Sequence, residues 1–89
     1  MYSVYILYSE SLMNYYVGST ENLEKRIKEH NSAKGNYTSK GVPWKLMIKI
    51  EKETRSEAVS LEMKIKKRGI KRYLQDNSLI DFSGRSAAR

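Results

Sequence analysis

The sequence predicts an α+β fold in which a small three-stranded antiparallel β-sheet is flanked by helices. Two stretches rich in β-forming residues come first, a stretch with helical periodicity follows, and one later β-forming stretch precedes a second helical region. The predicted order is therefore β-β-α-β-α-α. The 89 residues suffice for one domain with one modest core. We expect this domain to cover residues 1–76 and residues 77–89 to form a partly disordered tail.

The first two strands are expected to form a short hairpin. Residues 2–8 and 15–19 are aromatic, β-branched, aliphatic or small, and the segment between them is polar at both ends and can turn the chain. Tyr5 and Tyr16 would then approach each other on one face of the ladder, where the spacing alone favours a packing pair. Gly18 would let the backbone bend after the second strand without a Cβ clash.

The first helix is predicted over residues 20–31. Ser19 or Thr20 can accept hydrogen bonds from the free amides at its start. Leu23 and Ile27 lie four residues apart and supply an apolar stripe that can pack against the sheet. The hairpin and this helix therefore form one predicted unit.

Residues 32–45 are predicted to form a loop because they contain two glycines, a proline and several small polar residues. Lys40 and two other lysines make the loop basic, and Tyr37 lies in its middle. The loop is either a solvated connection or a segment that leans over bound nucleic acid. Residues 46–51 follow as the third strand.

Two helices are predicted after the third strand. Thr54 and Glu57 have the spacing of a capping box at the start of the first of them, and Gly69 is placed to end it in a left-handed cap. Its apolar stripe runs through Ala58, Leu61 and Ile65. A short helix over residues 71–76 completes the predicted domain.

Composition limits the chemistry. Seventeen Lys and Arg against ten Asp and Glu give a net charge of +7, which favours a polyanionic partner such as nucleic acid or an anionic surface. The absence of cysteine excludes disulfides and thiolate metal sites, and a single histidine argues against a structural zinc site. We find no signal-peptide pattern and no apolar run long enough to span a bilayer, so we expect a cytoplasmic protein that does not enter membranes.

Five side chains form the candidate catalytic set: Tyr5, Tyr16, Arg26, His30 and Glu62. Arg26 and His30 lie four residues apart, so the predicted helix places them on one face. Each of the five also has an ordinary structural explanation. Tyrosines in strands usually pack, a single histidine on a helix is more often structural than catalytic, and Glu62 has the spacing to pair with Lys66.

Taken together, these residues resemble the GIY-YIG nuclease family. Val4-Tyr5-Ile6 and Tyr16-Val17-Gly18 stand where the family has its two signature halves, with Ser3 and Val4 in place of Gly and Ile and with Val17 in place of Ile. The likeness continues through Gly18-Ser19-Thr20, Asn22-Leu23, Arg26, Glu29-His30-Asn31, Tyr37-Thr38, Pro43-Trp44 and Glu57-Ala58-x-x-x-Glu62-x-x-Ile65-Lys66. It spans roughly residues 2–74. The size resembles the small standalone bacterial members, and the hairpin and helix resemble the nuclease domains of excision-repair and homing endonucleases.

The resemblance implies a phosphodiesterase that uses one metal ion. Glu62 would hold Mg²⁺ or Mn²⁺ through a carboxylate oxygen, and Arg26 would bind the scissile phosphate. Tyr16, together with Tyr5, would orient or deprotonate the attacking water, and His30 would relay the proton or contact phosphate. We place Tyr16 first as the general base and leave Tyr5 and His30 open.

The remaining basic residues are expected to contact the DNA backbone. This predicted set comprises Lys40, Lys64, Lys66, Lys67, Arg68 and Lys71. We therefore expect an endonuclease that recognises the shape of branched, nicked or single-stranded DNA rather than a long sequence. The alternative is a nucleic-acid-binding module of the same fold whose catalysis is weak or depends on a protein partner that supplies specificity.

Overall fold

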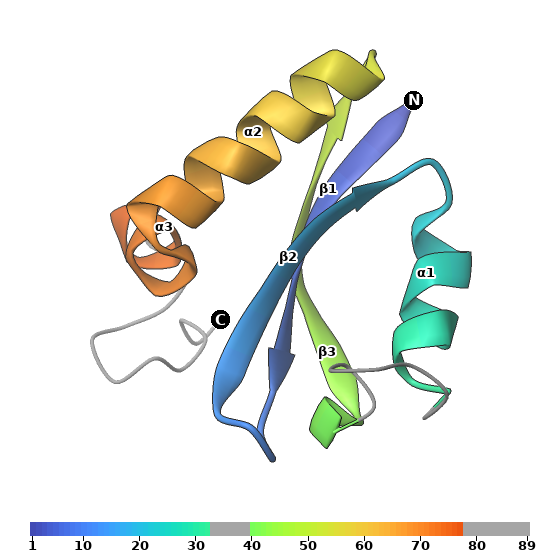
Figure 1. Cartoon of the computed structure of the whole chain (residues 1–89), viewed down its shortest axis with the longest axis vertical. Helices are drawn as coiled ribbons and strands as arrows, with labels where there is room; N and C mark the ends of the chain where they lie inside the picture. Colours follow the sequence, from blue (N-terminus) through green and yellow to red (C-terminus); the bar gives the residue numbers. More distant parts are fainter. Residues whose placement is uncertain (33–39, 78–89) are drawn as a thin grey trace.

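The computed structural model describes residues 1–32 and 40–77 of the chain (Figure 1). The elements are β1 (Tyr2–Ser9), β2 (Asn14–Thr20), α1 (Leu23–His30), β3 (Trp44–Lys52), α2 (Arg55–Arg68) and α3 (Ile70–Asp76). The predicted α+β class and the order β-β-α-β-α-α are therefore confirmed. Tyr37, half of the predicted loop and nearly all of the predicted tail lie outside the described residues.

The three strands form one antiparallel sheet in the order β2-β1-β3, with β1 in the centre. Tyr5 lies opposite Gly18, and Leu7 lies opposite Tyr16. Because side chains alternate along a strand, this register places Tyr5 and Tyr16 on the same face of the sheet, as predicted.

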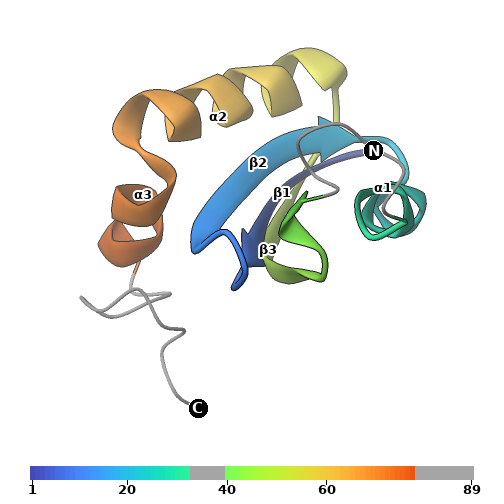
Figure 2. The ribbon, with the colours of Figure 1, turned by 60° about the horizontal axis from the view of Figure 1, so that its bottom comes forward.

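Each face of the sheet carries its own core. On one face, β1 and β2 pack against α2 and α3 through Val4, Ile6, Val17, Ala58, Ile65 and Leu74, all of them buried. On the other face, Tyr5, Leu7 and Trp44 pack against Leu23 and Ile27 of α1. Figure 2 shows α1 and α2 on opposite sides of the sheet. Full burial of one such aliphatic side chain stabilises a fold by about 1.5–3 kcal/mol. The apolar stripes that the sequence predicts therefore attach the helices to both faces of the sheet.

Helix α1 begins three residues later than predicted, and its cap is different. The Asn22 side chain accepts a hydrogen bond from the Lys25 amide at 3.1 Å, whereas neither Ser19 nor Thr20 caps the helix. The reason is that β2 continues to Thr20, which pairs with Ser3 of β1. Ser19 and Thr20, which local propensity assigns to the start of the helix, are therefore part of β2 because they pair with the distant strand β1.

Gly18 does not bend the chain, which corrects the expectation from sequence. It lies within β2, and a Cβ atom there would be 2.6 Å from the Tyr5 hydroxyl oxygen and 2.8 Å from Cζ of the same ring. Such distances are far below van der Waals contact. A glycine is needed at this position because the buried phenol of Tyr5 lies against the backbone of β2.

The other predicted boundaries are close to the observed ones. The capping box of Thr54 and Glu57 is present at the start of α2. Gly69 joins α2 to α3 with φ of 97° and ψ of 125°, so the positive φ is confirmed, but ψ lies outside the left-handed helical region. Strand β3 begins two residues early, at the buried Trp44. In the described part of the chain, no helix has the length and apolar character needed to cross a membrane.

Candidate active site

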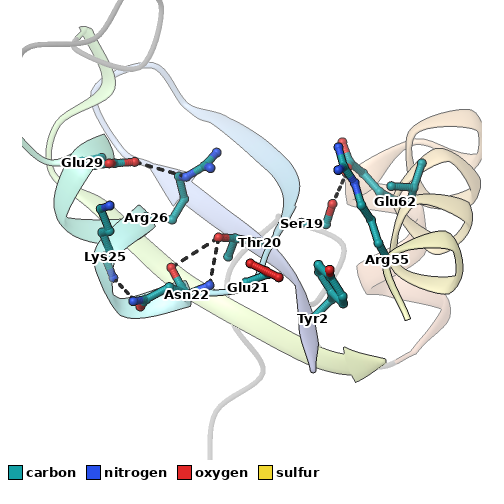
Figure 3. Close-up of a pocket in the computed structure, with 11 residues that line it drawn as sticks. Tyr2, Ser19, Thr20, Glu21, Asn22, Lys25, Arg26, Glu29, Arg55 and Glu62 are labelled. Atoms are coloured by element: carbon teal, nitrogen blue, oxygen red, sulfur yellow. Dashed lines mark hydrogen bonds and ion pairs between the residues drawn. The ribbon is translucent and has the colours of Figure 1, made fainter. Parts of the chain in front are cut away.

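A cleft of about 540 Å³ lies at the end of β2, between α1 and α2 (Figure 3). We call it the β2-end cleft. The side chains around it are those of Tyr2, Ser19, Thr20, Glu21, Asn22, Lys25, Arg26, Glu29, Arg55, Val59 and Glu62. The two helices lie on opposite sides of the sheet, so the end of the edge strand β2 is where their side chains can meet.

Glu62 extends from α2 to the end of β2. Its Oε1 atom accepts a hydrogen bond of 2.9 Å from the Ser19 hydroxyl, and its Oε2 atom pairs with the Lys66 ammonium at 2.9 Å. The side chain of Glu62 is 18% exposed, whereas that of Lys66 is 57% exposed. The carboxylate is therefore fixed on one oxygen by the sheet and covered on the other by a side chain with room to move.

Arg26 lines the same cleft from α1. Its Nε atom pairs with Oε1 of Glu29 at 3.2 Å, one helical turn along α1. Its side chain is 44% exposed, so it remains accessible to a ligand in the cleft. Figure 3 shows Arg26 on the α1 side and Glu62 on the α2 side. The structure thus brings two of the five predicted catalytic residues to one opening.

The other three predicted catalytic residues form a cluster beside the cleft. The Tyr5 hydroxyl and Nε2 of His30 share a hydrogen bond of 3.0 Å. The rings of Tyr5 and Tyr16 are stacked with centroids 6.4 Å apart, and the rings of Tyr16 and His30 meet edge to face with centroids 4.8 Å apart. Tyr5 and His30 are buried, whereas Tyr16 is only partly buried. Tyr16 is therefore the member of the cluster with surface left for a ligand.

Burial sets the charge states of the buried pair. It raises the pKa of Tyr5 strongly, with a further contribution from the neighbouring Tyr16 phenol, while the nearby Arg26 guanidinium opposes the rise. Burial also lowers the pKa of His30, and the charge of Arg26 adds to that effect. At neutral pH both side chains are uncharged. The Tyr5 hydroxyl is the donor when the imidazole carries its proton on Nδ1.

The predicted DNA-contacting residues are spread over several surfaces. Lys66 lies beside Glu62, whose hydrogen bond and charge raise the pKa of the lysine. Lys64 lines a separate depression on the other flank of α2, and the Arg68 guanidinium donates to both carboxylate oxygens of Asp76, at 2.7 and 3.1 Å. Lys40, Lys67 and Lys71 are exposed and do not line the β2-end cleft.

Sequence reasoning missed two side chains of this cleft, Ser19 and Arg55. Ser19 was considered as a helix cap and as part of the family resemblance but was not assigned to the site, and its bond to Glu62 spans 43 residues of sequence. Arg55 did have a detectable signal. Arg55 stands seven residues before Glu62. Positions 55, 59, 62 and 66 are spaced at helical intervals, which places them along one face of α2.

The oxygen donors of the cleft suit a hard divalent cation such as Mg²⁺ or Mn²⁺. Glu62 is the best placed of them, because its side chain is only 18% exposed and Ser19 of β2 holds one of its oxygens, whereas the Glu29 side chain is 55% exposed and pairs with Arg26. Within residues 1–32 and 40–77, no group of three or more His, Cys, Asp or Glu side chains could together hold a metal. A metal held in this cleft would therefore have Glu62 as its protein carboxylate.

Comparison with known proteins finds bacterial relatives that are all named UPF0213 proteins. A UPF0213 protein of Lactococcus lactis subsp. lactis, YsiG, is 42% identical over 48 residues, which are 53% of this chain and 46% of the relative. A UPF0213 protein of Bacillus licheniformis is 37% identical over 65 residues, 68% of this chain and 67% of the relative. The match to YsiG, like that to a second Lactococcus lactis relative, spans about half of the relative's length. No solved structure matches.

A family-level comparison covers most of the chain. Residues 1–74 match the GIY-YIG catalytic domain. The matched region contains all six structural elements except the last two residues of α3, and it includes every side chain of the β2-end cleft. The chain therefore belongs to the GIY-YIG catalytic domain family.

Proposed function

We propose that this protein is a metal-dependent endonuclease that hydrolyses DNA phosphodiester bonds in the β2-end cleft. The observation that carries the proposal is that Arg26 and Glu62, from helices on opposite sides of the sheet, line one cleft. Membership of the GIY-YIG family implies nuclease-type activity in general and supports DNA as the substrate. The positive net charge of +7 is consistent with a polyanionic ligand.

Arg26 is the residue that we assign to the scissile phosphate. A guanidinium can donate two parallel hydrogen bonds to phosphate oxygens and offset the negative charge that grows in the transition state. The ion pair with Glu29 holds the Arg26 side chain toward the cleft without burying it. Loss of one such donor typically lowers the rate of catalysis by about 100- to 1,000-fold.

Glu62 is the residue that we assign to the metal ion. Ser19 fixes one carboxylate oxygen, and the exposed Lys66 can swing away from the other. When bound, Mg²⁺ or Mn²⁺ would supply a Lewis acid that polarises the phosphoryl group and acidifies a coordinated water. Lys66 would then be free to contact a phosphate.

Tyr16 is the residue that we assign to the attacking water. Tyr5 is fully buried and has a raised pKa, so it is a poor base and a poor contact for water. The Tyr5–His30 hydrogen bond and the packing of both rings against Tyr16 support a positioning role for the buried pair. His30 is kept neutral and so remains able to accept a hydrogen bond from the Tyr5 hydroxyl.

We further propose that the enzyme recognises DNA by shape rather than by sequence. The side chains assigned above act on phosphate, metal or water, and contacts to phosphate position a strand without reading its bases. Branched, nicked or single-stranded DNA would place a phosphate in the cleft more readily than a continuous duplex.

A second function is favoured by one observation. Both oxygens of Glu62 already have partners, in Ser19 and Lys66. A carboxylate held in this way could instead be structural, in a module that binds nucleic acid and depends on a protein partner for catalysis and specificity.

The test is cleavage of labelled single-stranded, duplex, flap and branched DNA in Mg²⁺ or Mn²⁺, with chelator as the blank. We expect cleavage by the wild type that requires the metal and falls at least ~100-fold in Glu62→Ala and in Arg26→Ala. Glu62→Ala should keep its affinity for DNA, because the metal ligand is not a phosphate contact. Binding without cleavage across the whole panel would favour the partner-dependent module.

A further inference from the structure

Arg55 occupies a place on the cleft that the proposed mechanism does not use. It is the first residue of α2, it lines the β2-end cleft, and in Figure 3 it extends from α2 toward Ser19 and Glu62. Along α2, Arg55 lies seven residues before Glu62, and Lys66 lies four residues after Glu62. The Glu62 carboxylate therefore lies between two cations on one face of the helix.

The position of Arg55 does not favour the stability of the helix. The N-terminus of a helix carries a partial positive charge, so a cation in the first turn is electrostatically unfavourable. Within the described residues, no carboxylate lies within the 4.0 Å ion-pair distance of Arg55. Glu57, the acidic residue of the same turn, instead accepts a hydrogen bond of 3.2 Å from the amide of the N-cap residue Thr54. By contrast, Arg26 pairs with Glu29.

Arg55 also lies near Tyr2, another side chain of the β2-end cleft. The hydrogen bond and negative charge of Glu21 raise the pKa of Tyr2, and the guanidinium of Arg55 is close enough to oppose that rise. Both walls of the cleft therefore carry a guanidinium, Arg26 on α1 and Arg55 on α2, with the end of β2 between them.

We propose that Arg55 binds a second backbone phosphate of the substrate strand, adjacent to the phosphate bound by Arg26. The strand would then cross the end of β2 from α1 to α2, with the scissile phosphate on the Arg26 side. The ligand class is the phosphodiester backbone of a nucleic acid, for which an unpaired guanidinium is well suited. This inference rests on the proposed function, because it takes the β2-end cleft as the place where the strand binds.

The competing explanation is that Arg55 only neutralises part of the charge of Glu62. In that case its loss would change the affinity of the cleft for a divalent cation and would leave DNA binding without metal unchanged. A measurement of DNA binding in the presence of chelator therefore separates the two explanations.

The experiment is equilibrium binding of fluorescent DNA over a series of salt concentrations, with EDTA present so that no metal-dependent cleavage occurs. The variants are Arg55→Gln, Arg55→Lys and the matched control Lys52→Gln, which removes one positive charge near the other flank of α2. The plot of log K against log salt concentration has a negative slope, and the loss of one phosphate contact makes this slope shallower by about 0.7–0.9. We expect that change in Arg55→Gln, with an affinity about five- to eightfold lower at ~0.1 M salt, and wild-type slopes in Arg55→Lys and Lys52→Gln.

An unchanged slope in Arg55→Gln, or an equal loss in Lys52→Gln, would overturn the inference. Arg55 is exposed, and equal melting temperatures of the variants would show that the fold is intact. Failure of the proposed function gives a different result. If the wild type cleaves no DNA but Arg55→Gln still shows the loss of one phosphate contact, the proposed path of the strand stands and the proposed nuclease activity is wrong. If the wild type binds no DNA, both proposals are wrong.

Discussion

At the scale of single residues, the two oxygens of the Glu62 carboxylate have unlike partners. Oε1 accepts from Ser19, which is held in β2 by pairing with Val4, whereas Oε2 faces the exposed ammonium of Lys66. Groups that orient a metal ligand are worth about 10- to 100-fold in metal affinity. Ser19 therefore acts as a positioning residue in our account.

We predict that Ser19→Ala weakens the binding of Mn²⁺ by about 10-fold or more, because the carboxylate loses the donor that fixes its rotamer. Ser19→Thr retains a hydroxyl and should bind Mn²⁺ as the wild type does. The affinities can be measured from the paramagnetic broadening of NMR signals near Glu62, without any assay of activity. Equal affinities in Ser19→Ala and the wild type would remove Ser19 from the metal site.

His30 should make the stability of the protein depend on pH. Its pKa in the fold lies below the ordinary value of 6.5, so below that pH the unfolded chain binds a proton that the folded protein resists. The stabilising contribution is thus complete above pH 6.5 and is lost as the pH falls through the lower pKa of the fold. We predict that the wild type loses more free energy of unfolding between about pH 7.5 and about pH 5 than His30→Gln does. Urea denaturation at each pH measures this, and parallel losses in the two proteins would contradict it.

The sequence predicted some of these residues and could not predict others. The five candidate catalytic residues were identifiable because each matches a motif position of the GIY-YIG family. The helical spacing of Arg55 to Glu62 was a usable signal for Arg55, but the bond from Ser19 to Glu62 was not predictable, since it depends on how α2 crosses the end of β2. That crossing is a contact between distant parts of the chain, and no local spacing specifies it.

At the scale of elements, α1 is tied to β3 by one side chain. Asn31, directly after α1, accepts a hydrogen bond of 2.6 Å from the Trp44 amide and donates one of 3.3 Å to the Trp44 carbonyl. These bonds hold the end of α1 that carries His30. The position of His30 against Tyr5 and Tyr16 therefore depends on the docking of a short helix of eight residues.

We predict that Asn31→Ala lowers the free energy of unfolding by about 1–3 kcal/mol, because two hydrogen bonds are lost and each is worth about 0.5–1.5 kcal/mol. The matched control is Asn77→Ala, whose side-chain bond reaches only Tyr73, four residues away. Its cost should be below about 1 kcal/mol. Chemical denaturation of both variants gives the comparison, and equal losses would show that Asn31 does not anchor the helix.

The elements themselves were largely predictable, because periodicity and caps are local. The capping box of Thr54 predicted the start of α2 correctly. The start of α1 was placed too early, since Ser19 and Thr20 have cap propensity but are taken into β2 by pairing with β1. Gly18 was assigned to a bend for a similar reason. Its actual role, leaving room for Tyr5, depends on a strand pairing that sequence alone does not reveal.

At the scale of the whole molecule, the fold places the proposed chemistry at one edge of the sheet. Helices on the two faces can reach the same point only where an edge strand ends, and β2 is such a strand. Arg26 comes from one layer, Glu62 from the other, and Ser19 from the strand between them. We propose that the phosphodiester bond is cut at this meeting point.

The most direct test of that claim is the single-turnover rate of DNA cleavage by Glu62→Gln, measured with protein in excess over the best substrate of the panel. The amide keeps the size of the side chain and removes the negative charge that would hold the metal. Glu53→Gln, an exposed residue that does not line the cleft, is the matched control. We predict a rate at least ~100-fold below the wild type for Glu62→Gln, with DNA affinity within about twofold and with Glu53→Gln unchanged. Cleavage at the wild-type rate by Glu62→Gln would contradict the account.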